Sequence, residues 1–555
     1  MRLRYIAKTL GMIAAAATIG ACSLKEELPY ESRETFYKDE SACISMLYAC
    51  YNPLTTIYNY KFLMVTEFCS DTWYTTTSNL DAALSITPAK PEFGATVWRQ
   101  CYVGVERCNE AYHFIGLSGL DEGKKKQLMA EAVVMRAFYY YTLTCTFGGV
   151  PFYLDYVADM QAQDDLRYLP RSNADEIRAR LYEDIEENAL PYFTEENGLK
   201  VRECDAPQNR SGYALGLMLQ AKFAIWNKEW KKCLKPLQAL EELYGEFNET
   251  RYPLEETAWH VKNCAESIFE VQHSYDLTGV KVAGNCAVFM SPPHAGGGMF
   301  DGLYMPEIGE NLHNVTPART NRKFAGMLST GAGMNENNIT KNNVFGTLPL
   351  TYDYLDPSIS RYRVKIDMEA IQTGMKDGKK LDRRGAFLFG LGNLKTGETF
   401  GNVAKNGRLW GGPKFWCPDI YYANDDNNYR IFRYADVILM LAECWCELGD
   451  SDKALSYLNM VRDRAGAERF EAFESSETLM EEIRNERARE LTGEFQRKFD
   501  LVRWGIWYER TKEFTDNTSL KNRMRPCHRY YPIPDTQCAL SGYILNNPEY
   551  EAEQW

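Results

Sequence analysis

The chain has 555 residues, a formal net charge of −13 and an aromatic content of 13%. A protein this acidic is repelled by nucleic acid and by anionic membrane surfaces, so its charge argues against both as partners. Its 36 Tyr and 11 Trp exceed what a core normally requires. These rings combine a flat apolar face with a polar tip and therefore suit sugar rings, although a large core also accounts for many of them.

Residues 1–21 have the pattern of a targeting segment. Three basic residues precede an Ala-rich apolar stretch from Thr9 to Gly20, which is too short to cross a bilayer as a helix. The segment ends in Gly20-Ala21-Cys22, which resembles a bacterial lipobox. That resemblance implies a lipid on Cys22, which would become the first residue and hold the protein to a membrane. The alternative is an ordinary secretory signal with a coincidental cysteine.

The first part of the mature chain predicts a helix over 36–58, followed by an apolar run from Phe62 that ends at Ser70-Asp71. Trp73 and Tyr74 then fall in or beside a polar loop that extends to Asn79. Exposed aromatic residues on a loop indicate ligand binding. We therefore take Asp71, Trp73, Tyr74 and Asn79 as candidate ligand contacts; the alternative is that one of the two rings folds back onto the core.

Helical patterns then dominate. The stretch Glu131–Pro151 predicts a helix capped by Gly148-Gly149, in which Arg136 reads as one buried charge between packed helices rather than as a site residue. Residues 208–245 and 433–464 each predict two helices joined by a short turn, and such pairs resemble tetratricopeptide units. The predicted fold is mostly α: a tetratricopeptide-like scaffold of helical pairs, with a loop-rich insertion carrying short strands.

The insertion covers about residues 255–430 and divides the scaffold into parts 36–250 and 430–510. Ser267–Ser274 predicts a strand, whereas Gly and Pro crowd residues 291–309. Tyr304, Trp410 and Trp416 lie among turn residues and not on helical apolar faces. They are therefore poor candidates for a core and good candidates for stacking platforms in ligand binding.

Residues 481–505 predict one long helix, in which acidic and basic residues lie three or four positions apart. From charge alone the expected structure is a solvated, salt-bridged helix face. The order of the residues, however, resembles the C-terminal signature of the SusD/RagB family, I-R-N-E-R-x-x-E-L-x-x-E-x-x-R-x-F-D-L-x-R-W-G. Gly493 and Phe495 depart from the family pattern, in which Phe and Gly usually stand at these two positions.

Other segments extend the resemblance. They are the pattern E-A-x-x-x-R-A-F-Y-Y-Y-x-L-x-x-x-F-G-G-V-P from Glu131, Tyr352–Pro357, Pro532–Pro534 and Asn546–Pro548. The family consists of surface lipoproteins that capture nutrients. It implies a single domain over 22–555, an outer-membrane location at the cell surface, a glycan ligand and a SusC-like TonB-dependent porin as partner. It also implies that the region of Trp73 supplies ligand contacts. Because loss of one partner from a partly buried ion pair is costly, we expect charged residues such as Arg497 and Asp500 to be structural.

No nucleotide-binding, hydrolase or zinc-protease motif occurs in the chain, and its six His are dispersed. We therefore expect no cofactor, no metal and no enzymatic activity, and we read 424–428 as a polar turn rather than a cation site. Two alternatives stay open. One is a surface glycoside hydrolase, since two carboxylates suffice for that reaction. The other is a helical-repeat adaptor that binds only protein or peptide.

Overall fold

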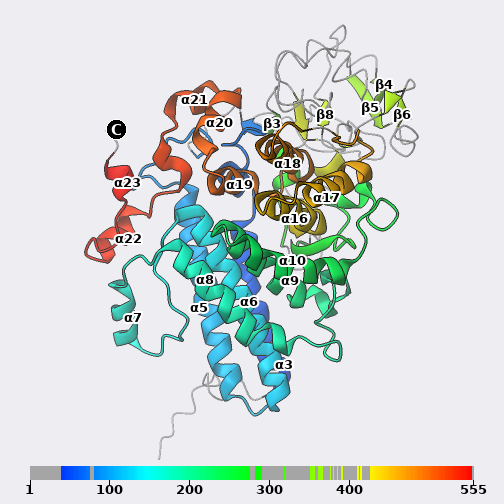
Figure 1. Ribbon diagram of the computed structural model, residues 1–555. Coiled ribbons are helices and arrows are strands. Elements are labelled where there is room, and N and C mark those ends of the chain that lie inside the picture. Colours follow the sequence, from blue (N-terminus) through cyan, green and yellow to red (C-terminus); the bar gives the residue numbers. More distant parts are fainter. Residues whose placement is uncertain are drawn as a thin grey trace, which may run out of the picture.

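The computed structural model describes residues 39–75, 81–274, 282–290, 425–471 and 473–552, together with short strands and segments of the insertion. Helices make up most of the described chain, and the strands of the insertion lie at the upper right of Figure 1. The prediction of a mostly α fold is confirmed.

A layer of long helices forms the N-terminal half, and α6 lies buried at its centre. Gly104 allows α5 to approach α6 closely, since a Cβ there would lie 2.3 Å from the ring of Tyr139. Gly148, at φ +73°, follows the last residue of α6, as the sequence predicts. The helices of this layer are α3 (Glu40–Ile57), α5 (Phe93–Leu117), α6 (Glu122–Phe147) and α8 (Ala174–Asn188).

Two helical hairpins form the second half of the scaffold. The turn of the second hairpin contains Gly449 at φ +84°, a conformation that glycine adopts without strain. Helix α10 packs against α16, so the hairpins stack although about 190 residues separate them in sequence. This arrangement confirms the predicted scaffold of helical pairs. The hairpin helices are α9 (Tyr213–Trp226), α10 (Trp230–Tyr244), α16 (Tyr434–Glu447) and α17 (Ser451–Arg464).

The insertion leaves and rejoins the scaffold through one buried two-stranded sheet. Strand β2 (Ser267–Val271), which the sequence predicts, pairs antiparallel with β10 (Tyr429–Arg433). All residues of both strands are buried, so the two ends of the insertion are held together inside the core.

The other strands also pair antiparallel, β1 with β3, β4 with β5, β6 with β7 and β8 with β9. They are β1 (Trp73–Thr75), β3 (Ala318–Thr320), β4 (Leu350–Asp356), β5 (Arg361–Ile366), β6 (Met375–Lys376), β7 (Lys379–Lys380), β8 (Phe389–Leu391) and β9 (Leu409–Gly411). The shorter helices are α4 (Tyr60–Thr66), α7 (Met160–Arg167), α11 (Cys286–Met290), α20 (Trp507–Phe514), α21 (Thr518–Arg523), α22 (Asp535–Leu540) and α23 (Pro548–Glu551).

The prediction of one long helix over 481–505 is wrong. The segment forms α18 (Ser476–Leu491) and α19 (Arg497–Arg503), joined by a turn in which Gly493 has φ +81° and Phe495 has φ +61°. A Cβ on Gly493 would lie 2.5 Å from the ring of Phe415, so only glycine fits there. Phe495, in exchange, fills the core between Tyr58 and Trp259. The two departures from the family pattern therefore mark the break between the helices.

The free energy of unfolding should fall when Gly493 is replaced. Gly493→Ala combines backbone strain with a clash against Phe415 and should cost about 2 kcal/mol or more, measured by chemical denaturation. Gly505→Ala is the matched control, because Gly505 also has a positive φ but no atom within 4 Å of its Cβ position. The control should lose only the stability that backbone strain costs, about 1–2 kcal/mol of unfolding free energy. Equal losses in the two variants would contradict the packing argument.

Candidate functional site

The segment that leads into the predicted binding loop is anchored at the break between α18 and α19. The Glu67 carboxylate, just after α4, accepts hydrogen bonds from the backbone N–H groups of Gly493, Gln496 and Arg497 at 2.9–3.1 Å. These N–H groups surround the start of α19 and have no acceptor within that helix. A side chain 430 residues away therefore caps α19.

Asp71 forms the second anchor. It accepts hydrogen bonds from the side chains of Arg497, at 2.6 and 2.7 Å, and Arg510, at 2.7 Å. Burial raises the pKa of Asp71, but the two guanidinium groups outweigh it and hold the pKa at about 2. The carboxylate is fully buried, so the prediction that Asp71 contacts a ligand hydroxyl is wrong. Its two oxygens are already used within the protein.

Trp73 and Tyr74 are not exposed, which corrects the prediction for both. The Trp73 side chain has no exposed surface, its Nε1–H donates to Thr492 Oγ1 at 2.6 Å, and its ring packs edge-on against Phe415. Tyr74 is buried as well. The physical reason is the pair of arginines on Asp71, which keeps the polar Ser70-Asp71 segment inside the protein, so the chain stays in the core for several residues more.

The strands that lead into the predicted loops converge at one place. Strand β1 pairs with β3, and β3 lies against β9, which contains Trp410. Segments that lie more than 300 residues apart in sequence are thus brought together. Asn79, Tyr304 and Trp416, like Cys22 at the N-terminus, lie outside the described residues.

A buried ion network holds the insertion to the scaffold at this place. Arg384 donates from the insertion to Glu486 at 2.6 Å and to Glu490 at 3.2 Å. Lys414 donates to Glu494 at 2.5 Å. Nothing near Arg384 or Lys414 in the sequence predicts these contacts, because the glutamates that the two side chains contact lie 76 or more residues away.

Scaffold residues complete the ion network. Arg433 pairs with Glu266, Glu490 and Glu494 at 2.6–2.9 Å, and Arg464 pairs with Glu266 and Glu490. Burial raises the pKa of Glu490, but the arginines around it hold that pKa well below its usual range. An ionised carboxylate that guanidinium groups saturate cannot donate a proton to a glycosidic oxygen, so Glu490 is not suited to act as a general acid.

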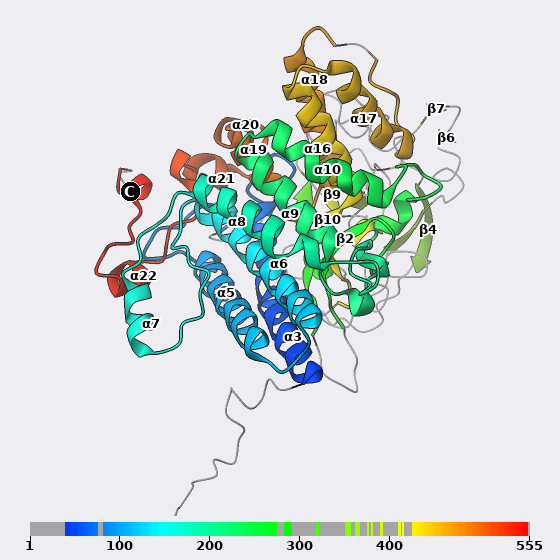
Figure 2. The ribbon, with the colours of Figure 1, turned by 60° about the horizontal axis from the view of Figure 1, so that its bottom comes forward.

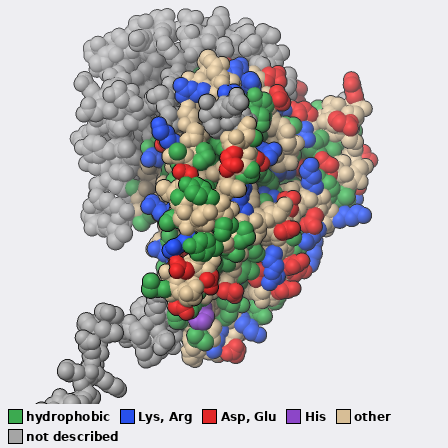
Figure 3. All heavy atoms as spheres, turned by 90° about the vertical axis from the view of Figure 1, so that its left-hand side faces the viewer, with side chains coloured by type: hydrophobic (Ala, Val, Ile, Leu, Met, Phe, Trp, Pro, Cys, Tyr) green, Lys and Arg blue, Asp and Glu red, His purple; other side chains and the backbone are tan. Residues whose placement is uncertain are grey.

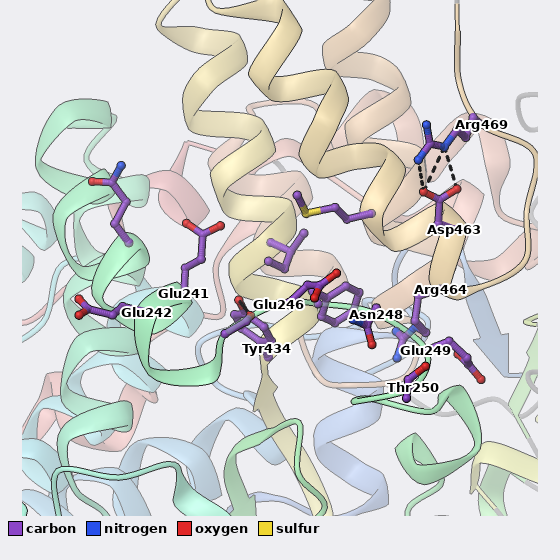
Figure 4. A pocket seen from close by; sticks show the side chains of 15 residues that line it. Glu241, Glu242, Glu246, Asn248, Glu249, Thr250, Tyr434, Asp463, Arg464 and Arg469 are labelled. Carbon is purple, nitrogen blue, oxygen red and sulfur yellow. Dashed lines mark hydrogen bonds and ion pairs between the residues drawn. The ribbon is translucent and has the colours of Figure 1, made fainter.

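An acidic cleft of about 860 Å³ lies between the two hairpins (Figure 4). Glu241, Glu242 and Glu246 contribute carboxylates, and Asp463 is paired with Arg469 at 2.6 Å. Tyr457 donates to Glu241 at 3.0 Å. The negative charge of this cleft suits a cationic group better than a neutral sugar.

A second groove, of about 670 Å³, lies between α5 and α22. Figure 3 views the molecule from the side on which α7 and α22 lie, where hydrophobic, acidic and basic side chains are interspersed. Exposed apolar side chains here include Met160 on α7, Tyr168 just after α7 and Leu540 on α22. Neither sign of charge predominates among the described side chains of this face.

Two further observations concern membranes and metals. No helix among the described residues combines the length and apolarity needed to cross a bilayer. The same residues contain no group of three or more His, Cys, Asp or Glu side chains placed to hold a metal ion. Asp425 accepts hydrogen bonds from the N–H groups of Ala287 and Asn427 and forms a β-bridge with Gly284. Asp425, Asn427 and Asn428 are buried, so the described part of 424–428 is not the polar turn that the sequence predicts.

Two family models match the chain. One, described as the SusD family, matches residues 420–550, and the other, described as starch-binding associating with outer membrane, matches residues 29–196. The chain belongs to the SusD/RagB family. Its curated relatives include SusD-like protein P25 of Formosa agariphila, 23% identical over 84% of this chain and 81% of the relative. SusD-like protein P2 of the same organism is 24% identical over 82% and 80%.

Solved structures share the fold of this SusD/RagB protein. A SusD homolog from Bacteroides thetaiotaomicron VPI-5482 has a TM-score of 0.65 at 17% identity, covering 92% of this chain and 97% of its own. The surface glycan-binding protein A of Bacteroides uniformis has a TM-score of 0.63 at 18% identity, with coverages of 92% and 99%. The likeness therefore extends over nearly the whole of each chain.

Arg497 and Asp500 should contribute to stability rather than to ligand binding. Asp500 accepts hydrogen bonds from Arg487 and Arg503, and Arg497 donates to Asp71. Both carboxylates, Asp500 and Asp71, are buried. Arg497→Ala or Asp500→Ala removes one partner from a buried charge network, although Asp71 keeps Arg510, Arg487 keeps Asp436 and Arg503 keeps Glu443. Each substitution should still cost about 3–5 kcal/mol of unfolding free energy, measured by chemical denaturation. Arg469→Ala is the control: it removes an exposed pair with Asp463 worth about 0–1 kcal/mol. Lost affinity with unchanged melting would mean that the network is a ligand site.

Proposed function

We propose that the mature chain, a single domain over residues 22–555, binds an extracellular glycan at the cell surface and delivers it to a SusC-like TonB-dependent porin. The observation that carries the proposal is the convergence of β1, β3 and β9, which start or contain the loops with the predicted aromatic contacts. The names of the relatives support a glycan ligand: one solved structure is a surface glycan-binding protein. One matching family model is described as starch-binding.

The proposed ligand contacts are now Asn79, Tyr304, Trp410 and Trp416. Trp73 and Tyr74 support these contacts indirectly, since their buried rings hold β1 in the core. The rigid base matters because contacts on well-positioned elements lose less conformational freedom when a ligand binds. We propose binding without catalysis. In support, Glu490 is paired with several arginines and cannot act as a general acid. The carboxylates of the acidic cleft are the reason to test the hydrolase alternative directly.

Glycan binding should be detectable with the purified soluble domain on a glycan array. Trp410→Ala should then weaken binding of the best array ligand by about 5- to 150-fold, because one stacking platform is worth about 1–3 kcal/mol. Isothermal titration measures the effect. Tyr168→Ala, which removes an exposed ring just after α7, is the control and should bind like the wild type.

Three outcomes of this experiment would contradict the proposal in different ways. Product released from any array glycan by the pure protein would favour the hydrolase. Binding of peptides but of no glycan would favour the adaptor. Wild-type affinity of the Trp410→Ala protein would place the ligand away from β9.

We propose that a lipid on Cys22 anchors the protein in the outer membrane. Support comes from the Gly-Ala-Cys junction and from the family model whose description includes association with the outer membrane. Two acyl chains give stable anchoring where one is marginal. Cys22→Ala should move the protein from the membrane fraction to the soluble fraction, measured by fractionation and immunoblotting. Cys204→Ala, which removes an internal free thiol, is the control. Unchanged fractionation of the Cys22 variant would contradict the anchor.

A further inference from the structure

A hollow of about 580 Å³ lies beside α3, apart from the predicted loops. Its walls come from α3, from the turn at 208–210 and from residues 270–274 at the end of β2. Figure 2 brings the side with α3 forward, whereas β3 lies at the opposite end of the molecule in Figure 1. The volume is within the range of small-molecule sites, about 300–1,000 Å³.

The charged residues of the hollow are neutralised inside the protein. Arg210 donates to Glu131 at 3.0 Å, and Glu270 accepts from Arg430 at 3.0 Å and from the Asn263 N–H at 2.9 Å. Burial lowers the pKa of His273 to about 4, so its ring is neutral at physiological pH. Among the described residues that line the hollow, none therefore offers an unpaired charge to a ligand, in contrast to the acidic cleft.

The accessible groups are an aromatic ring and side-chain amides. Tyr48 is 41% exposed, and its hydroxyl donates to the side chain of Gln208. Asn52 and Asn209 add amide groups that make no hydrogen bond with any described residue. An apolar ring face beside neutral donors and acceptors matches the C–H face and hydroxyl groups of a sugar.

The turn that presents the side chains of Gln208 and Asn209 is strained. Gln208 and Asn209 have φ of +57° and +53°, the left-handed region that residues other than glycine adopt at a cost of about 1–3 kcal/mol. Such conformations persist where surrounding structure holds them and cluster at ligand sites. Here the turn is held by the hydrogen bond from Tyr48 and by the Asn209 N–H, which donates to the Ala206 carbonyl at 3.1 Å.

We propose that this hollow, the α3 hollow, binds a neutral pyranose unit as a second saccharide site. The choice of a sugar as ligand rests on the proposed function, but the site itself rests on the lining of the hollow. A long glycan that occupies both the α3 hollow and the proposed site where β1, β3 and β9 converge would gain avidity from the two contacts. Short fragments would occupy the two sites independently.

The experiment is isothermal titration with four neutral hexasaccharides, an α-glucan, a β-glucan, a xylan and a mannan fragment. The variants are Tyr48→Ala, which removes the ring, and Asn209→Gly, which removes an amide where glycine relieves the backbone. Tyr543→Ala, which removes a ring that is 65% exposed beyond α22, is the matched control. Melting temperature verifies folding, and Asn209→Gly carries the test if Tyr48→Ala fails to fold.

The wild type should bind at two sites. Tyr48→Ala should weaken one of them by about 5- to 150-fold, Trp410→Ala the other, and Tyr543→Ala neither. If the wild type binds a hexasaccharide but Tyr48→Ala and Asn209→Gly titrate like it, the α3 hollow is overturned and the proposed function stands. If the wild type binds none of the four, both proposals are overturned. A hollow that takes only peptides, shown by Tyr48-dependent binding of a tryptic peptide mixture, would also overturn the saccharide site.

Discussion

The fold depends on the buried ion network between α18 and the segments that converge on it. The single carboxylate of Glu490 pairs with three arginines, from β10, α17 and the insertion: Arg433, Arg464 and Arg384. Each of these side chains is at most 1% exposed. Loss of one partner from such a network leaves a charge stranded in a low-dielectric interior, which costs far more than the pair itself contributes. The scaffold and the insertion are therefore coupled: neither can shift without uncovering an unpaired charge.

The same region links the scaffold to the surface that we propose binds glycan. Glu67 caps α19, Asp71 joins Arg497 and Arg510, and Trp73 donates to Thr492 in the turn between the helices. Together these contacts immobilise the base of β1. Loops that emerge from a fixed base can carry variable ligand contacts while the base stays constant, which is how a rigid framework supports changing specificity.

The described cavities differ in charge, and the differences suggest distinct roles. The acidic cleft between the hairpins keeps several carboxylates near its surface, the groove at α22 is mixed, and the α3 hollow is electrically neutral. Polysaccharides are long, so a protein that captures them gains more from several weak neutral contacts than from one strong charged contact. The neutral α3 hollow fits this requirement, whereas the acidic cleft fits a cationic partner better.

The sequence by itself determined the helical pairs, the strand that begins at Ser267, the glycine that ends α6 and the family signature, because each depends on local periodicity or residue order. Only the tertiary structure decided that α18 and α19 are separate helices. The decisive contacts, Phe415 against Gly493 and Glu67 on the backbone of α19, come from residues 78 and more than 400 positions away. It also decided that Trp73 is buried. Seen locally, Ser70-Asp71 ends an apolar run and predicts a loop, but two distant arginines satisfy Asp71 and let the chain remain in the core. Charge spacing likewise cannot distinguish a solvated helix face from a buried network, since that difference depends on which other segments supply the opposite charges.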